Sequence, residues 1–169
     1  MKIAFIISSI NSKSNGNGGH YFSLIETVKM LSINNEVIIY NIGNSPATAL
    51  KNTEFKLISI IHKKIAFTQI YKDLLVSIKE EQPEIIHSFD AIAYFWGRLV
   101  SSKLNIKSCL TKCGGINQIY FPFCDNFILY SKENFDYYQS KNKFKNSNLF
   151  LIPNRINTFP NDKKRIIKL

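Results

Sequence analysis

Two glycines followed by a histidine form the first group of residues that could do chemistry in this 169-residue chain. Gly18, Gly19 and His20 lie between an apolar, strand-like run and a helical pattern. Glycines let the backbone approach a ligand closely, and a helix N-terminus presents unpaired N–H groups that suit an anionic group. The three residues are therefore predicted to contact substrate. The alternative is an ordinary strand–helix turn in which His20 is only a polar residue at the start of a helix.

A second group follows two strand-like runs near the middle of the chain. His87 ends one run, and Cys113 and Gly114 follow the next one. All three are predicted to contact substrate, although His87 equally suits a hydrogen-bonded place in the core. A nucleophilic pair of Cys113 and His87 is conceivable, but no orienting Asn or Asp is identified for it. Asp90 suits two roles, the N-cap of the next helix or a bond to a sugar hydroxyl.

A third group, Asn154 and Arg155, follows the last strand-like run. The Arg155 guanidinium could contact a phosphate there, and a solvent-facing linker residue is the equal alternative. The aromatic stretch 120–123 could dock a lipid or a sugar ring, but packing beneath its own loop is favoured. These patterns predict substrate-binding residues and leave the catalytic residues unassigned.

Motifs for cofactors and metals do not fit the sequence. A dinucleotide-binding fingerprint starting at Gly16 would need a glycine where Tyr21 stands, and the second strand lacks the acidic residue that binds ribose. The sequence has no P-loop and no Asp-x-Asp pair. The spacing of Cys109, Cys113 and Cys124 lacks the second cysteine pair typical of a structural zinc site. We therefore expect reduced thiols, no metal and no cofactor.

Strand-like and helix-like segments alternate along the chain, and these elements must position the three groups. Short apolar runs predict strands, and apolar residues at helical spacing predict helices. We expect strands at 2–8, 36–42, 55–61, 84–87, 107–111, 126–130 and 149–152, and helices at 20–32, 63–82, 91–104 and 133–143. The alternation indicates right-handed β-α-β crossovers. The predicted fold is α/β: a Rossmann-like open parallel sheet of about seven strands with helices on both faces.

The expected domain organisation follows from the same pattern. Residues 1–152 are predicted to form one domain, and residues 153–169 to begin a linker. Ligands of an open parallel sheet bind outside the carboxyl ends of its strands. Five of the seven glycines lie in the loops after the first and fifth predicted strands, which favours a ligand cleft at that edge.

The chain has a net charge of +10, and most of the excess lies near its C-terminal end. Residues 141–169 carry eight basic side chains and one acidic side chain. Such asymmetry is typical of a tail, a linker or a docking surface for something acidic, such as an anionic membrane surface, although a compositional bias toward Lys, Asn and Ile explains it equally well. No nucleic-acid-reading motif accompanies the charge, so no nucleic acid is expected. A membrane span of ~20 apolar residues and a signal peptide are also absent from the sequence, which predicts a cytoplasmic protein.

Five stretches, in order, resemble the N-terminal half of the family 4 retaining glycosyltransferases, which have the GT-B fold. The family's opening strand, Gly-Gly loop, helix and second strand resemble residues 3–40. Residues 83–87 (PEIIH) are similar to its P-[DE]-[IV]-[IV]-H strand, and Cys113-Gly114 to its His-Gly loop. Residues 125–131 and 152–159 resemble its last two motifs.

This resemblance implies the acceptor-binding domain of a nucleotide-sugar-dependent glycosyltransferase, of hexosyltransferase type, in bacterial surface polysaccharide or glycolipid biosynthesis. Its partners would be a nucleotide-sugar and a sugar or lipid-linked acceptor, and the protein would be peripheral at the inner membrane face. The nucleotide-sugar would be held chiefly by a second domain with a pair of glutamates, which is absent here, so the fragment is expected to be inactive alone. Cys113, Arg155 and Asn157 replace the family's His, Gly and Asp. A non-enzymatic module that recruits a membrane or a partner is the alternative.

Overall fold

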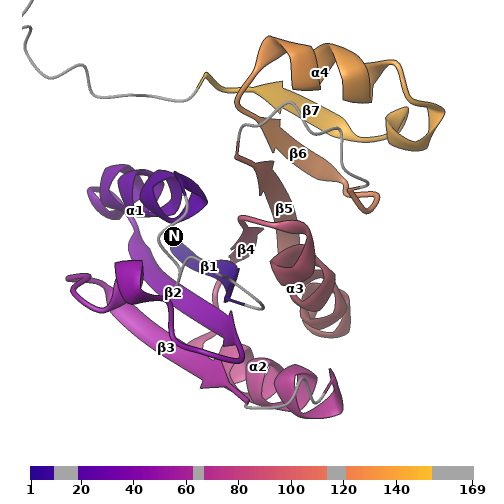
Figure 1. The fold of residues 1–169 in the computed structure, drawn as a ribbon. Helices are drawn as coiled ribbons and strands as arrows, with labels where there is room; N and C mark the ends of the chain where they lie inside the picture. Colours follow the sequence, from indigo (N-terminus) through magenta and orange to yellow (C-terminus); the bar gives the residue numbers. More distant parts are fainter. Residues whose placement is uncertain (10–18, 63–66, 114–120, 154–169) are drawn as a thin grey trace, which may run out of the picture.

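The computed structural model describes residues 1–9, 19–62, 67–113 and 121–153, and within these ranges seven strands form a single sheet (Figure 1). The sheet order is β3-β2-β1-β4-β5-β6-β7, and every neighbouring pair of strands is parallel. The strands are β1 (Lys2–Ser9), β2 (Glu36–Gly43), β3 (Lys56–Ile61), β4 (Ile85–Ser88), β5 (Lys107–Lys112), β6 (Asn126–Leu129) and β7 (Asn148–Leu151). The predicted Rossmann-like α/β fold is confirmed.

The central strands consist of the residue types that a doubly covered parallel sheet requires. β1 and β2 are rich in isoleucine, and nearly all their residues are buried. β-Branched side chains pack well on a pleated surface, and a strand with both faces covered shows a continuous apolar run instead of an alternating one. This pattern explains why the first two strands could be predicted from the sequence.

Four α-helices and two short 3-10 helices connect the described strands. The α-helices are α1 (Gly19–Ser32), α2 (Phe67–Glu81), α3 (Ala91–Leu104) and α4 (Lys132–Gln139), and the 3-10 helices are η1 (Thr48–Leu50) and η2 (Asn142–Phe144). α2 stops at Gln82, whose φ of 51° is left-handed and whose N–H donates to the Ile78 carbonyl, just before Pro83. α3 ends at Asn105, which is also left-handed, with a φ of 56°. Both are ordinary ways to end a helix.

The last helix is shorter than predicted. A helix over 133–143 was expected, but α4 ends at Gln139 and the backbone is extended at Lys141 before η2. The physical reason is Phe144, which is buried with its ring 5.0 Å from that of Tyr138 and 5.7 Å from that of Phe127. Burying this ring requires the chain to turn back toward the sheet, and the apolar contact outweighs continuation of a polar helix.

The helices cover the two faces of the sheet unequally. α2, α3 and α4 pack on one face, through two core clusters that extend from β3 to β7. On the other face, within the described ranges, α1 and η1 pack over β1 and β2. Helices therefore lie on both faces, as predicted, but among the described residues no helix covers the α1 side of β4 to β7 (Figure 1). None of the helices in the described segments is both long and apolar enough to span a bilayer.

Candidate functional site

The strand order has a switch point at the centre of the sheet, between β1 and β4, and we call this position the crevice because open α/β sheets form a ligand crevice there. β1 and β4 are neighbours, yet the chain leaves β1 toward α1 on one face and leaves β4 toward α3 on the other. The carboxyl ends of these two strands therefore diverge, and this divergence is where ligands bind in open α/β sheets. Ser8 and Ser9 end β1, and Ser88 ends β4.

Asp90 connects the two sides of this crevice. Its carboxylate accepts hydrogen bonds from the Ser8 backbone N–H at 2.8 Å and from the Ser8 hydroxyl at 2.9 Å. It also accepts one from the Ala93 N–H at 2.8 Å, as the N-cap of α3. The structure thus confirms the helix-capping role, and it ties the end of β1 to the start of α3. These three hydrogen bonds use three of the roughly four acceptor positions of the carboxylate, so about one position is left for a sugar hydroxyl.

The start of α1 forms the other wall of the crevice. Tyr21 is buried, and its hydroxyl donates to the Ser8 carbonyl at 2.7 Å. The His20 ring lies 4.2 Å from the Tyr21 ring, and burial lowers the His20 pKa, an effect that the Asp90 charge partly offsets. A Cβ added at Gly19 would meet no atom of the described residues within 4 Å. Gly19 and His20 therefore lie at the crevice, where the sequence predicted them.

His87 is a buried, neutral side chain. Its Nε2 atom lies 2.6 Å from the Thr111 hydroxyl, and its ring packs against those of Phe5 and Phe89, at 5.2 and 4.8 Å. Burial lowers the pKa of His87 to about 3. A base this weak removes protons poorly near neutral pH, so a positioning role through Thr111 fits His87 better than the role of a general base. His87 also lines a groove beside α1, and its predicted contact with substrate stays a prediction.

The two cysteines of this region, Cys109 and Cys113, are both half-buried but lie at different positions relative to His87. A nucleophilic pair of Cys113 and His87 requires β4 and β5 to be neighbours, and they are. In the register of these two strands, however, the residue opposite His87 is Cys109. Cys113 follows β5, and its Sγ lies 4.0 Å from the Phe89 carbonyl oxygen. Burial raises the pKa of both thiols to about 12. A thiol that stays protonated is a poor nucleophile, so the geometry gives no support to a nucleophilic Cys–His pair.

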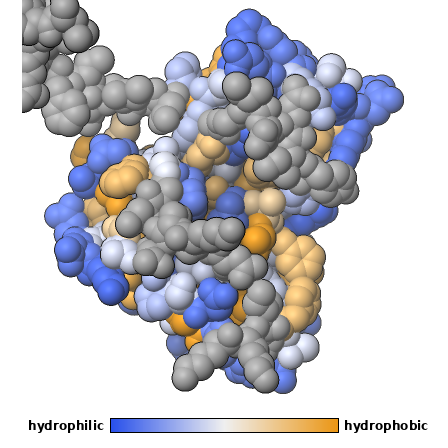
Figure 2. Space-filling model, in the orientation of Figure 1, coloured by the Kyte–Doolittle hydropathy of each residue, from blue (hydrophilic) through white to orange (hydrophobic). Residues whose placement is uncertain are grey.

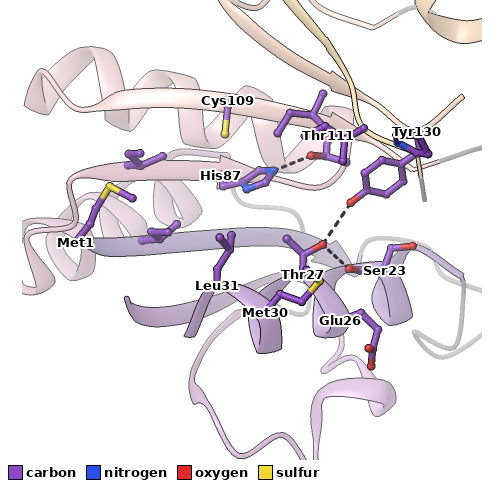
Figure 3. A pocket seen from close by; sticks show the side chains of 15 residues that line it. Met1, Ser23, Glu26, Thr27, Met30, Leu31, His87, Cys109, Thr111 and Tyr130 are labelled. Atoms are coloured by element: carbon purple, nitrogen blue, oxygen red, sulfur yellow. Dashed lines mark hydrogen bonds between the residues drawn. The ribbon is translucent and has the colours of Figure 1, made fainter. Parts of the chain in front are cut away.

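A groove of ≈ 490 Å³ extends along the sheet beside α1 (Figure 3). Its polar side chains largely pair with one another: His87 with Thr111, and Thr27 of α1 with the Tyr130 hydroxyl at 3.3 Å. The rest of the lining is mainly apolar and comes from α1 and from the uncovered strands: Met1, Ile3, Met30, Leu31, Ile85, Ile128, Ile152 and Pro153. The groove reaches the carboxyl edge of the sheet at Tyr130 and Pro153.

The groove contains residues that sequence reasoning missed. Thr27, Thr111 and Tyr130 were not singled out, although Thr111 and Tyr130 end predicted strands and so carry a usable signal. For the aromatic stretch 120–123, packing beneath its own loop was the favoured prediction. Phe121 packs in this way, with its ring 5.7 Å from that of Phe127. The predicted site residues Gly18, Gly114, Asn154 and Arg155 lie outside the described residues. In the described part of the chain, no group of three or more His, Cys, Asp or Glu side chains could hold a metal ion.

Comparisons with known proteins identify the fold. No family model matches the chain, and no curated protein matches it in sequence. The solved structure of HepE from Anabaena, in complex with UDP and glucose, matches with a TM-score of 0.66 at 14% identity, over 92% of this chain and 45% of HepE. The fold is that of one half of a GT-B glycosyltransferase. The lipopolysaccharide outer core galactosyltransferase WaaB matches with a TM-score of 0.65 at 16% identity, over 92% of this chain and 46% of WaaB.

The GT-B fold also occurs in other enzymes of nucleotide-sugars. A Listeria monocytogenes protein assigned as a UDP-N-acetylglucosamine 2-epimerase matches with a TM-score of 0.53 at 13% identity, over 85% of this chain and 43% of that protein. The chain thus spans less than half the length of each of these proteins. At such identities the likeness shows the fold alone.

Proposed function

We propose that the chain is the N-terminal, acceptor-binding half of a nucleotide-sugar-dependent glycosyltransferase of the retaining family 4. The observation that carries the proposal is the match of 92% of the chain to less than half of HepE and of WaaB. The family motifs in the sequence, in their order, favour a transferase over an epimerase of the same fold. WaaB is a galactosyltransferase of the lipopolysaccharide outer core, which supports bacterial surface polysaccharide or glycolipid biosynthesis as the context.

The crevice between β1 and β4 would hold the acceptor sugar in this proposal. Gly18, Gly19 and His20 would contact the acceptor or the donor phosphate from the start of α1, and Cys113 with Gly114 would approach the transferred sugar from the end of β5. Beside these residues, Asp90 ties the end of β1 to the start of α3, because it bonds to Ser8 and Ala93. His87 supports the floor of the crevice as a neutral group.

The donor would be bound chiefly by a second domain, together with Asn154 and Arg155 at the crossover between the domains. Transfer requires donor and acceptor to be held together in reacting geometry, and much of the rate enhancement comes from that positioning. One half alone is therefore expected to have negligible transferase activity. No metal or cofactor beyond the nucleotide-sugar substrate is invoked.

The test compares the chain alone with the chain extended by the coding sequence that follows Leu169 in its gene. The extended protein should consume a nucleotide-sugar from a panel of UDP- and GDP-sugars in the presence of a membrane extract, and the anomeric configuration of the product should be retained. A continuation without a second Rossmann-like domain, or an extended protein that neither binds nor consumes any nucleotide-sugar, would refute the proposal.

One substitution pair tests the crevice in the extended protein. His20→Ala should lower kcat/KM by about tenfold, because it removes a contact at the substrate. Phe22→Ala is the matched control: Phe22 lies two residues further along α1, is 60% exposed and belongs to neither the crevice nor the groove. Equal losses from both substitutions would show that the start of α1 matters for stability and not for substrate.

A further inference from the structure

The apolar face of the sheet beneath α1 ends in two buried polar residues. Ile7 of β1 and Ile39 of β2 belong to the core cluster under α1. Side chains two positions further along a strand point to the same face, so Ser9 and Asn41 also face α1. Each of these two residues is only 1% exposed, whereas hydrophilic side chains gather at the molecular surface, most clearly over α4 (Figure 2). Polar groups buried this deeply need hydrogen-bond partners, because an unpaired one costs stability.

Ser9 and Asn41 form one hydrogen-bonded unit with the loop that follows β2. Asn41 Nδ2 donates to Ser9 Oγ at 3.0 Å, and Asn41 Oδ1 accepts from the Ala47 N–H at 2.9 Å. The Ser9 hydroxyl donates in turn to the Ser45 carbonyl. Both ends of the Asn41 amide group are thus engaged by protein groups. Asn41 is therefore placed to hold other residues in position and not to contact a substrate itself.

Close packing at Gly43 brings the same loop against the end of β1. Gly43 lies opposite Ser9 in the register of β1 and β2. A Cβ at Gly43 would be 2.5 Å from the Ser9 hydroxyl oxygen and 2.8 Å from the Ser9 carbonyl carbon. A side chain at this position would therefore push the loop away from β1, so the glycine supports the contacts that Ser9 and Asn41 make.

The end of β1 is held from two sides. Ser8 bonds to Asp90, and its carbonyl accepts a hydrogen bond from the Tyr21 hydroxyl. Ser8 thus links the end of β1 to the starts of α3 and α1, whereas Ser9 links it to the loop after β2. Because Ser8 and Ser9 are consecutive, a displacement of one moves the other. Loss of the bonds at Ser9 should therefore reach the start of α1 through Ser8 and Tyr21.

We propose that Asn41 is a positioning residue of the crevice. Through Ser9 it holds the end of β1, and through β1 it holds the start of α1, which bears Gly19 and His20. Asn41 then affects sugar transfer without touching the substrate. This effect on transfer rests on the proposed function, whereas the effect on Gly19 and His20 can be measured in the chain alone.

The first experiment follows the start of α1 by NMR in the 169-residue chain and in its Asn41→Val variant. Valine is close to asparagine in size and suits a strand, but it makes neither hydrogen bond. His20 is the reporter, because burial lowers its pKa and the Asp90 charge only partly offsets this effect. If the start of α1 moves outward in the variant, the pKa of His20 should rise toward its ordinary value of 6.5. The amide resonances of Gly19 and His20 should shift as well.

Ile78→Val is the control for a general loss of stability. Ile78 belongs to α2 and to the core cluster on the other face of the sheet, so its shortening should leave the His20 pKa and the resonances of α1 unchanged. If Asn41→Val does not fold, Ser9→Ala takes its place, because it removes only the hydroxyl that bonds to Asn41. An unchanged His20 in the folded variant, or equal changes in the control, would overturn the proposal.

The second experiment uses the extended protein with its second domain. Asn41→Val should lower kcat/KM by about tenfold, mainly through kcat, because a small displacement of a group that positions substrate slows transfer. Ile78→Val should leave both constants nearly unchanged. Wild-type constants in Asn41→Val would also overturn the positioning role. An extended wild type without activity counts against the proposed function instead, and the NMR measurement then decides the role of Asn41.

Discussion

Asp90 is the residue on which the geometry of the crevice most directly depends. It bonds to Ser8, 82 residues earlier in the chain, from which it accepts two hydrogen bonds, and it accepts a third from the nearby Ala93. Asp90→Ala should lower the free energy of unfolding by about 2 kcal/mol, the sum expected from a lost N-cap and lost bonds to a carboxylate. Asp90→Asn keeps one acceptor oxygen and should lose less. Urea unfolding of the two variants measures the difference, and an equal, small loss would show that the bonds to Ser8 contribute little.

His87 should make the stability of the protein depend on pH. Its pKa is lowered to about 3 in the folded state from the ordinary value of 6.5, so between these values the unfolded chain binds more protons. The stability is therefore fully present above about pH 6.5 and falls as the pH is lowered, until the loss levels off near the folded pKa. A loss of about 2 kcal/mol is expected between about pH 6.5 and about pH 5. Urea unfolding at the two pH values measures it.

His87→Gln is the matched variant for this titration. Glutamine keeps a polar group near the Thr111 hydroxyl, the partner of His87, but carries no proton that titrates in this range. The variant should therefore be less stable than the wild type at neutral pH, yet lose clearly less stability on acidification. If stability fell equally with pH in the two proteins, His87 would not be the group responsible. Other groups, such as the half-buried His20, would then be tested.

At the scale of elements, Gly97 allows α3 to lie close to the sheet. A Cβ at this position would be 2.8 Å from the Ser88 hydroxyl, 3.1 Å from Ile86 and 3.2 Å from Ile6. Alanine is a better helix former than glycine by about 1 kcal/mol, so a helix free of contacts would be stabilised. Here Gly97→Ala should instead destabilise the protein by about 1–3 kcal/mol, because the added methyl group overpacks the core. Thermal unfolding should show a lower Tm.

Two further variants test the cause of that loss. Ser88→Ala removes the nearest clashing atom and should restore part of the stability in the double variant with Gly97→Ala. Ser102→Ala, at an exposed position of the same helix, should be neutral or slightly stabilising. If Gly97→Ala behaved like Ser102→Ala, close packing of α3 would not be the reason for the glycine.

The elements themselves were largely predictable, because local apolar patterns specify them. The strands at 36–42 and 126–130 and the helix at 91–104 agree with β2, β6 and α3 to within one residue at each end. Contacts between distant residues were not predictable in this way. Nothing local indicates that Asp90 bonds to Ser8, that Cys109 and not Cys113 lies opposite His87, or that burial of Phe144 ends α4 early. Such facts depend on strand order and register, which a single sequence does not encode as a local pattern.

At the scale of the whole molecule, helices cover the sheet unequally. The apolar side chains exposed at β7 should make copies of the chain associate with one another. On β7, Phe150 and Leu151 are 45% and 39% exposed, and Ile152 after it is 41% exposed. β7 is also an edge strand of the described sheet. Exposed, apolar sheet edges promote pairing between chains. Sedimentation velocity should therefore show association that increases with protein concentration.

The same measurement on two variants distinguishes this surface from others. Phe150→Lys with Ile152→Lys should reduce the association strongly, because a charged edge strand pairs poorly. Val76→Lys adds charge on α2 and should leave the association nearly unchanged. Association that persists in the β7 variant would direct attention to other exposed apolar side chains, such as Phe67 and Phe95.

The parallel arrangement of all seven strands also has an evolutionary consequence. The side chains that hold the domain together lie within the strands and beneath the helices, whereas the crevice is bordered by residues at the carboxyl ends. Selection can change those end residues without repacking the interior. One scaffold can then acquire a new specificity in a few steps, which agrees with a shared backbone in HepE, WaaB and this chain at identities of 14% and 16%.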